Sequence, residues 1–111
     1  MIRPGDVVLV TLDPTKGAEQ AGRRPAVVVG GPYNWGSLAI IVPLSTSDRG
    51  WVSHVAITTD RRSFAMCEQV RSVSMDRIAR TVASVEADDL REIQATVARL
   101  VGVYGAGLRS S

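Results

Sequence analysis

The 111-residue chain has little of what most familiar catalytic and metal sites require. It contains one cysteine, Cys67, and one histidine, His54. A single cysteine excludes an intramolecular disulfide and a cysteine-based zinc site, and a single histidine excludes a two-histidine ribonuclease pair. Neither a phosphate-binding P-loop nor a GxGxxG or GxSxG motif is present. We therefore expect a protein with no metal and no cofactor.

Long apolar runs are also missing. The longest, residues 38–44, suits a buried strand and is far too short to span a membrane, and the N-terminus lacks the apolar core of a signal peptide. We expect a soluble cytoplasmic protein with no membrane contact. Cys67 closes a short apolar run, where we expect it to be a small buried hydrophobe and not a nucleophile.

Lysine is nearly absent, since 12 of the 13 basic residues are arginine and only Lys16 is lysine. Arginine presents a planar fork that suits phosphate, where lysine presents a point charge. A GC-rich genome would produce the same bias. With a formal net charge of only +2 and a pI near 9.2, the charge balance permits nucleic-acid binding without demanding it.

The distribution of apolar residues predicts a single domain, residues 1–111, that is mainly β with a C-terminal α-helix. Hydrophobic residues make up 45% of the chain and charged residues 22%, as in globular domains. Apolar residues from Leu90 to Tyr104 recur at helical spacing. We expect a small, strongly bent β-barrel capped by that helix. The segments that resemble strands are residues 7–12, 25–30, 38–44, 52–59, 64–73 (one or two strands, interrupted at Glu68) and 78–85, and a turn is expected at 30–37.

The polar loop between the first two predicted strands, residues 13–25, is long for a domain of this size and therefore suggests a functional site. Pro25 biases the preceding Arg24 towards extended backbone. A rigidly placed guanidinium can grip a phosphate with two hydrogen bonds and neutralise charge that develops in a transition state. The alternative is structural, a salt bridge from Arg24 to Glu19 or Asp13.

Hydroxyl groups gather where the strand at 38–44 ends. Ser45 or Thr46 could donate a hydrogen bond to the phosphate that Arg24 holds. RNA would supply its own nucleophile, the 2′-hydroxyl, so the protein would need mainly alignment and electrostatics. A nucleophilic Ser45 would instead need His54 to fold back onto it.

Six segments are distinctive when taken together. They are residues 3–7 (RPGDV), 13–20 (DPTKGAEQ), 22–29 (GRRPAVVV), 42–47 (VPLSTS), 54–55 (HV) and 67–73 (CEQVRSV). In order and spacing they resemble the MazF/PemK family of toxin endoribonucleases, over nearly the whole chain. The block G-x-E-Q-x-G-x-R-P together with E-Q-x-R makes the resemblance specific.

The resemblance implies the SH3-like barrel of CcdB/PemK toxins, usually a homodimer, and the toxin component of a type II toxin-antitoxin system. It implies sequence-specific, metal-independent cleavage of single-stranded RNA by 2′-hydroxyl attack, which leaves 2′,3′-cyclic phosphate and 5′-hydroxyl ends. The substrate would be messenger RNA, with transfer or ribosomal RNA as further candidates, and cleavage would inhibit translation and growth. A cognate MazE-like antitoxin would occupy the RNA groove.

Matched residue by residue, the resemblance implies a catalytic Arg24. Ser45 stands where the family has a catalytic threonine, so the hydroxyl is kept and the methyl that restricts its rotamer is lost. For proton transfer Glu19 is the first candidate and His54 the second; the alternative for His54 is a strand residue at a pocket rim. We predict RNA binding by Lys16, Gln20, Thr46, His54, Glu68 and Gln69.

Three further points stay open at this stage. Trp35 and Trp51 could stack on bases or be partial core. A CcdB-like toxin that binds DNA gyrase is an alternative, although that toxin uses a C-terminal Trp-Gly-Ile and residues 107–111 contain no tryptophan. The second alternative is a relative of these toxins that only binds its antitoxin.

Overall fold

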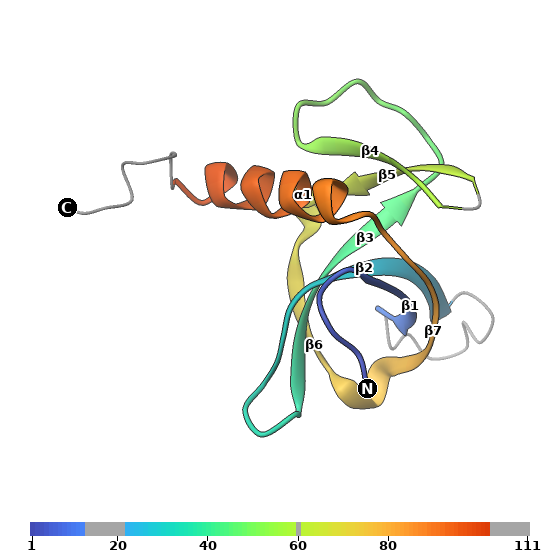
Figure 1. Cartoon of the computed structure of the whole chain (residues 1–111), viewed down its shortest axis with the longest axis vertical. Coiled ribbons are helices and arrows are strands. Elements are labelled where there is room, and N and C mark those ends of the chain that lie inside the picture. Colours follow the sequence, from blue (N-terminus) through green and yellow to red (C-terminus); the bar gives the residue numbers. More distant parts are fainter. Residues whose placement is uncertain (13–21, 60, 103–111) are drawn as a thin grey trace.

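A computed structural model of the chain describes residues 1–12, 22–59 and 61–102. It contains seven strands, two short 3₁₀ helices among the described residues, and an α-helix close to the C-terminal end of the described chain (Figure 1). In chain order the elements are β1 (Asp6–Thr11), β2 (Arg23–Tyr33), β3 (Leu38–Ser45), β4 (His54–Thr58), β5 (Arg62–Met66), η2 (Cys67–Gln69), β6 (Arg71–Ser74), η3 (Met75–Arg77), β7 (Ile78–Ser84) and α1 (Ala87–Leu100).

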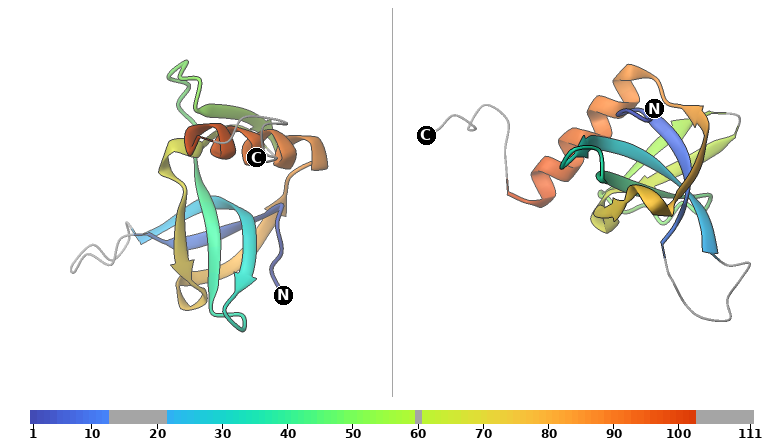
Figure 2. Two further views of the ribbon diagram at one scale, coloured as in Figure 1. Left: turned by 90° about the vertical axis from the view of Figure 1, so that its left-hand side faces the viewer. Right: turned by 90° about the horizontal axis from the view of Figure 1, so that it is seen from below.

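The strands form one strongly curved antiparallel sheet in the order β4-β5-β3-β2-β1-β7, and β6 pairs with β3 (Figure 2). The register shifts twice between β1 and β7 and twice between β2 and β3. Such bulges bend a strand and increase its twist. The curvature lets β3 pair with β2 and β6 along its first part and with β5 at its end. Strand β3 is therefore paired along its whole length, and β5 holds its last two residues.

The sheet has a hydrophobic core on each face, which explains why its central strands are apolar without interruption. On β1, Val7 belongs to one cluster, whereas Val8 and Val10 belong to the other. On β2, Val27 likewise faces away from Val28. Side chains alternate between the faces of a strand, so a strand that is buried on both sides must be apolar throughout.

Helix α1 covers one of these cores and packs against β4, η2 and β2 (Figure 1). Its Ile93 is fully buried among the residues of the core. Asp88 and Asp89 lie in the first turn and Arg99 in the last, each favourable to the helix dipole. Gly102, with φ of 95°, follows the helix in the left-handed conformation that commonly ends helices.

The mainly β fold with one C-terminal helix confirms the prediction from the sequence. The interruption expected at Glu68 is the 3₁₀ helix η2 between β5 and β6. The turn expected at 30–37 is wrong in its first half, because β2 continues to Tyr33. Gly and Pro are tolerated there because the pairing with β3 is bulged. The chain turns only after Tyr33, where Asn34 and Trp35 both have positive φ.

Candidate functional site

A groove of about 820 Å³ crosses the surface where the start of β2 and the end of β3 meet β4 and η2. Among the described residues, its wall carries three arginines and a single carboxylate, so it favours an anionic ligand. The lining residues are Leu12, Arg24, Pro43, Ser45, Ser47, Arg49, Trp51, His54, Met66, Glu68, Gln69 and Arg71.

The register of β2 and β3 brings Arg24 and Ser45 to the same place. Ala26 pairs with Pro43 and Val27 with Val42. Continuing this antiparallel register by two residues puts Arg24 opposite Ser45. Side chains at opposite positions of two antiparallel strands lie on the same face, about 5 Å apart at Cβ. Both residues line the groove.

The side chains of Arg24 and Ser45 both keep hydrogen-bond donors that no described residue accepts from. Arg24 is exposed, and among the described residues it has no hydrogen-bond or ion-pair partner. Ser45 Oγ accepts a hydrogen bond of 3.0 Å from the backbone N–H of Ser47. A hydroxyl that accepts from a backbone amide still has its own proton to donate. The pair therefore presents a guanidinium and a hydroxyl donor to the same point in the groove.

Glu68 is the one carboxylate that the described residues contribute to the groove, and two neighbouring side chains contact it. Ser53 donates to its Oε1 at 2.7 Å, and His54 Nε2 lies 3.1 Å from its Oε2. Partial burial acts to raise the pKa of Glu68. The hydrogen bonds from Ser53, from its own backbone N–H and from His54, together with the charge of His54, outweigh burial and lower that pKa. Glu68 is therefore a fixed anion at neutral pH.

The His54 side chain is almost completely covered, with 3% of its surface exposed. Its ring lies 5.0 Å from the Trp51 ring, centroid to centroid, at a tilt of 48°. Within the described residues, its buried Nδ1 has no hydrogen-bond partner. His54 is thus packed under Trp51 and tied to Glu68, and only an edge of it reaches the groove.

Trp51 and Arg49 line the groove beside His54. Half of the Trp51 surface is exposed. The Arg49 guanidinium carbon lies 5.4 Å from the centre of the Trp51 ring, within the range of a cation–π contact. Trp51 therefore keeps exposed aromatic surface next to an arginine, in a groove that also holds Arg24.

Two other arginines hold the end of β1. Arg71 donates to the carbonyl of Leu12 and Arg77 to the carbonyl of Thr11, each at 3.2 Å. Arg71 also lines the groove. Arg71 therefore has a structural partner in addition to its place in the groove.

The structure brings together five of the predicted site residues, namely Arg24, Ser45, His54, Glu68 and Gln69. Thr46 is exposed and lines an adjoining hollow of about 360 Å³, which shares Arg24 and Ser45 with the groove. Lys16, Glu19 and Gln20 lie outside the described residues.

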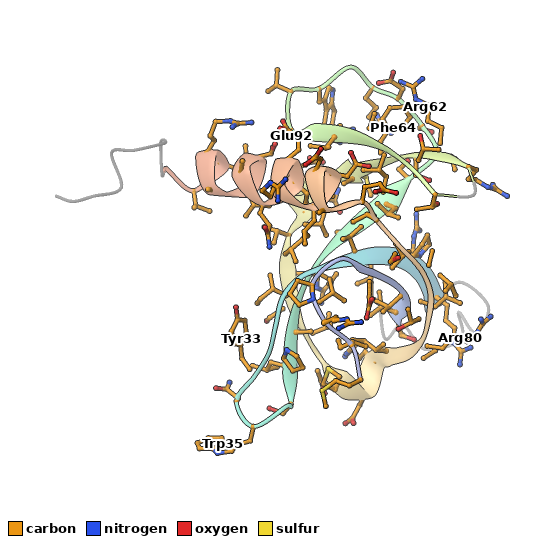
Figure 3. All side chains as sticks on the ribbon, viewed as in Figure 1. Tyr33, Trp35, Arg62, Phe64, Arg80 and Glu92 are labelled. Atoms are coloured by element: carbon orange, nitrogen blue, oxygen red, sulfur yellow. The ribbon has the colours of Figure 1, made fainter. Side chains whose placement is uncertain are left out.

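Sequence reasoning missed Ser53 and Arg49. Ser53 lies 15 residues from Glu68, and nothing in its local sequence indicates that the two would meet. Of the two tryptophans, Trp51 lines the groove, whereas Trp35 lies fully exposed at the tip of the β2–β3 hairpin (Figure 3).

Cys67 is fully buried in the core, which confirms the expectation of a small hydrophobe. Burial, with the nearby charges of Glu68 and Glu92, raises the pKa of the Cys67 thiol to about 11. A thiol that stays protonated at neutral pH is a poor nucleophile.

Within residues 1–12, 22–59 and 61–102, no group of three or more His, Cys, Asp or Glu side chains is placed to hold a metal ion. The helix found in these ranges is also too short and too polar to cross a membrane.

Comparison with known proteins identifies the family. Residues 3–101 match the model of the PemK-like, MazF-like toxin of type II toxin-antitoxin systems. The endoribonuclease toxin MazF of Escherichia coli K12 is 35% identical over 103 residues, which cover 88% of this chain and 92% of that protein.

Solved structures agree. MazF of Deinococcus radiodurans superimposes with a TM-score of 0.77 at 28% identity, over 92% of this chain and 97% of that one. A chain of a MazE–MazF structure from the same organism superimposes with a TM-score of 0.78 at 26% identity, over 93% of this chain and 98% of that one. The Mycobacterium tuberculosis toxin MazF-mt6, at 12% identity, shares the fold, with a TM-score of 0.70 over 89% and 98%. The family resemblance is thereby confirmed: this chain belongs to the PemK-like, MazF-like toxins of type II toxin-antitoxin systems.

Proposed function

We propose that this toxin is a sequence-specific endoribonuclease that cleaves single-stranded RNA without a metal ion and so inhibits translation. The observation that carries the proposal is that Arg24 and Ser45 line one groove, at positions that the register of β2 and β3 places opposite each other when it is continued by two residues. Among the described residues, the charged wall of this groove is mainly cationic. The name of the Escherichia coli relative, an endoribonuclease toxin, supports the same activity.

Arg24 binds the phosphate that is to be cleaved. A guanidinium can donate two parallel hydrogen bonds to phosphate oxygens and remains charged at any ordinary pH. Because Arg24 is already extended at the start of a strand and has no partner among the described residues, little rearrangement is needed before it binds. Its charge stabilises the additional negative charge of the pentacovalent phosphorus.

Ser45 donates its hydroxyl proton to a non-bridging oxygen of the same phosphate. Ser45 Oγ accepts a hydrogen bond from the Ser47 backbone N–H, and its own hydroxyl proton stays available for donation. The substrate supplies the nucleophile: its 2′-oxygen bonds to phosphorus, and the bond from phosphorus to the 5′-oxygen breaks. The products are a 2′,3′-cyclic phosphate and a 5′-hydroxyl.

Two protons move in this step, one away from the 2′-hydroxyl and one onto the departing 5′-oxygen. His54 is poorly placed for either transfer, because 3% of its side chain is exposed and its Nε2 faces Glu68. Glu19, the first candidate from the sequence, lies outside the described residues. We assign Glu19 as the acceptor of the 2′-hydroxyl proton, and this assignment rests only on its position in the sequence.

We further propose that residues 1–111 act as one toxin domain, that the toxin is a cytoplasmic homodimer, and that a MazE-like antitoxin inhibits it by covering the groove. The MazE–MazF structures of Deinococcus radiodurans support an antitoxin partner. Competition between antitoxin and a labelled oligonucleotide for the purified toxin tests this arrangement.

The test of the activity is cleavage of a mixed-sequence RNA by the purified, antitoxin-free protein in EDTA, followed by analysis of the product ends. We expect discrete fragments with 2′,3′-cyclic phosphate and 5′-hydroxyl ends, and their loss in Arg24→Ala. Intact RNA in the presence of folded protein would contradict the proposal and favour a relative that only binds its antitoxin.

A further inference from the structure

Within the part of the chain that the structure describes, the groove contains one charge of the wrong sign for RNA. Its arginines attract phosphates, yet Glu68 lies on the same wall with 28% of its side chain exposed. An uncompensated carboxylate would repel the backbone of a nucleic acid. A carboxylate that takes no part in proton transfer is useful in an RNA groove where it meets a group that donates hydrogen bonds. Such donors are found on the edges of the bases.

The surroundings of Glu68 make it a fixed acceptor. Ser53 and His54 each contact a different carboxylate oxygen, at 2.7 and 3.1 Å, so rotation of the group is restrained. The carboxylate has about four acceptor positions in all. Ser53, His54 and the backbone N–H of Glu68 itself use three of them, so one remains for a ligand. Because Ser53 is itself 8% exposed, this restraint comes from beneath the groove surface.

Trp51 supplies a stacking surface at the same end of the groove. Its ring lies against His54, the residue that also contacts Glu68, and half of its surface is exposed. Single-stranded RNA is commonly recognised by stacking an unpaired base on an aromatic ring and bonding its Watson–Crick edge. Trp51 provides the stacking face and Glu68 the fixed acceptor of such a subsite, and His54 contacts both.

We propose that Trp51 and Glu68 form a nucleobase subsite that selects bases with an exocyclic amino group, such as cytosine or adenine, and rejects uracil. The inference rests on the proposed function and specifies which bases the groove prefers. An amino group donates to the carboxylate. Uracil presents two carbonyl oxygens and a single N–H, so that its carbonyls approach the carboxylate unfavourably.

Cytosine and uracil give the sharpest test, because they are nearly the same size and differ chiefly where one has an amino group and the other a carbonyl. The experiment measures binding of 2′-O-methyl oligo(C) and oligo(U) at neutral pH, in fixed salt, by fluorescence anisotropy. The methyl group removes the nucleophile, so binding is measured without cleavage. We expect the wild-type protein to bind oligo(C) about tenfold more tightly, the size of one good base contact.

Two variants show whether Glu68 causes the preference. Glu68→Gln keeps the size and an oxygen for Ser53 but adds a donor that suits uracil, so we expect oligo(C) to lose most of its advantage. Glu92→Gln is the matched control: it makes the same change on α1, away from the lining residues of the groove, and should keep the preference.

Equal binding of the two oligonucleotides by the wild-type protein, or a preference that Glu68→Gln leaves unchanged, would overturn the subsite. Both results are distinct from failure of the proposed function, in which oligonucleotides with free 2′-hydroxyls bind but stay uncleaved. Circular dichroism of each variant confirms that a changed preference does not come from unfolding.

Discussion

The two ends of the groove are built in opposite ways. At one end, Arg24 and Ser45 present donors that no side chain of the described residues occupies. At the other, Glu68 already has Ser53 and His54 as partners, and His54 is packed beneath Trp51. The first end is prepared to bind a group that the protein lacks, and the second is held rigid by its own contacts.

This difference corresponds to two tasks. A phosphate carries the charge that changes during cleavage, so the group that binds it should be available and electropositive. A base edge must be compared with three similar alternatives, so the group that reads it should be fixed. We therefore expect mutations at the Arg24 end to affect the rate of cleavage, and mutations at the Glu68 end to affect selection and stability.

The largest effect is expected for Arg24→Ala, which removes the cation from the scissile phosphate. We expect the cleavage rate to fall by about 10²- to 10³-fold with little change in the free energy of unfolding, because Arg24 has no partner among the described residues to lose. Initial-rate assays and urea denaturation measure the two quantities.

The adjacent Arg23→Ala is the matched control for Arg24→Ala. Successive strand residues point to opposite faces, and Arg23 does not line the groove. A comparable loss of rate in this control would show that general basicity, and not the position of Arg24, drives cleavage.

A smaller loss of rate is expected for Ser45→Ala, about tenfold to a hundredfold, because one hydroxyl donor to the phosphate is removed. Ser45→Thr should match or exceed the wild-type rate, because threonine keeps the hydroxyl and its additional methyl group restricts the side-chain rotamer. Single-turnover assays with one RNA separate this step from product release. Full activity in Ser45→Ala would remove Ser45 from the proposed mechanism.

At the other end of the groove, Ser53→Ala should lower the free energy of unfolding by about 1–2 kcal/mol. The change deletes a partly buried hydrogen bond to a charged group and leaves Glu68 less restrained. Urea denaturation gives the value, and Ser47→Ala serves as an exposed serine control. If both variants are equally stable, the Glu68 end is not the rigid one.

The smallest effect concerns pH. The pKa of Glu68 is lowered in the folded protein from its ordinary value of 4.5. A lowered folded-state pKa contributes stability that is present above the ordinary value and disappears as pH falls through the folded-state value. The stability advantage of wild type over Glu68→Gln should therefore shrink below about pH 4.5. Denaturation midpoints between pH 3 and 7 test this, and an advantage that grows on acidification would contradict it.

Much of the fold follows from the sequence because local signals and tertiary packing agree. The apolar runs at residues 25–30 and 38–44 contribute side chains to the cores on both faces of the sheet, as continuous runs require. The strand that continues to Tyr33 was missed, because Gly and Pro usually end a strand and a bulge that accommodates them depends on the partner strand.

The site was predictable to a different extent at its two ends. Arg24 could be predicted as a site residue because Pro25 follows it, and Ser45 because it ends a predicted strand. The register of these two neighbouring strands then brings the two side chains together. The contact of Ser53 with Glu68 joins the residue before β4 to η2, so it depends on the tertiary fold. The position of Trp51 over His54 depends on the same packing.

The most direct test of the division between the two ends is to measure both binding and single-turnover cleavage of one short RNA by Arg24→Ala and Glu68→Gln. The account predicts that Arg24→Ala loses far more in the cleavage step than in affinity, whereas Glu68→Gln chiefly changes which base is preferred. If Glu68→Gln abolished the chemical step with its base preference intact, and Arg24→Ala changed only selection, the assignment of the two ends would be contradicted.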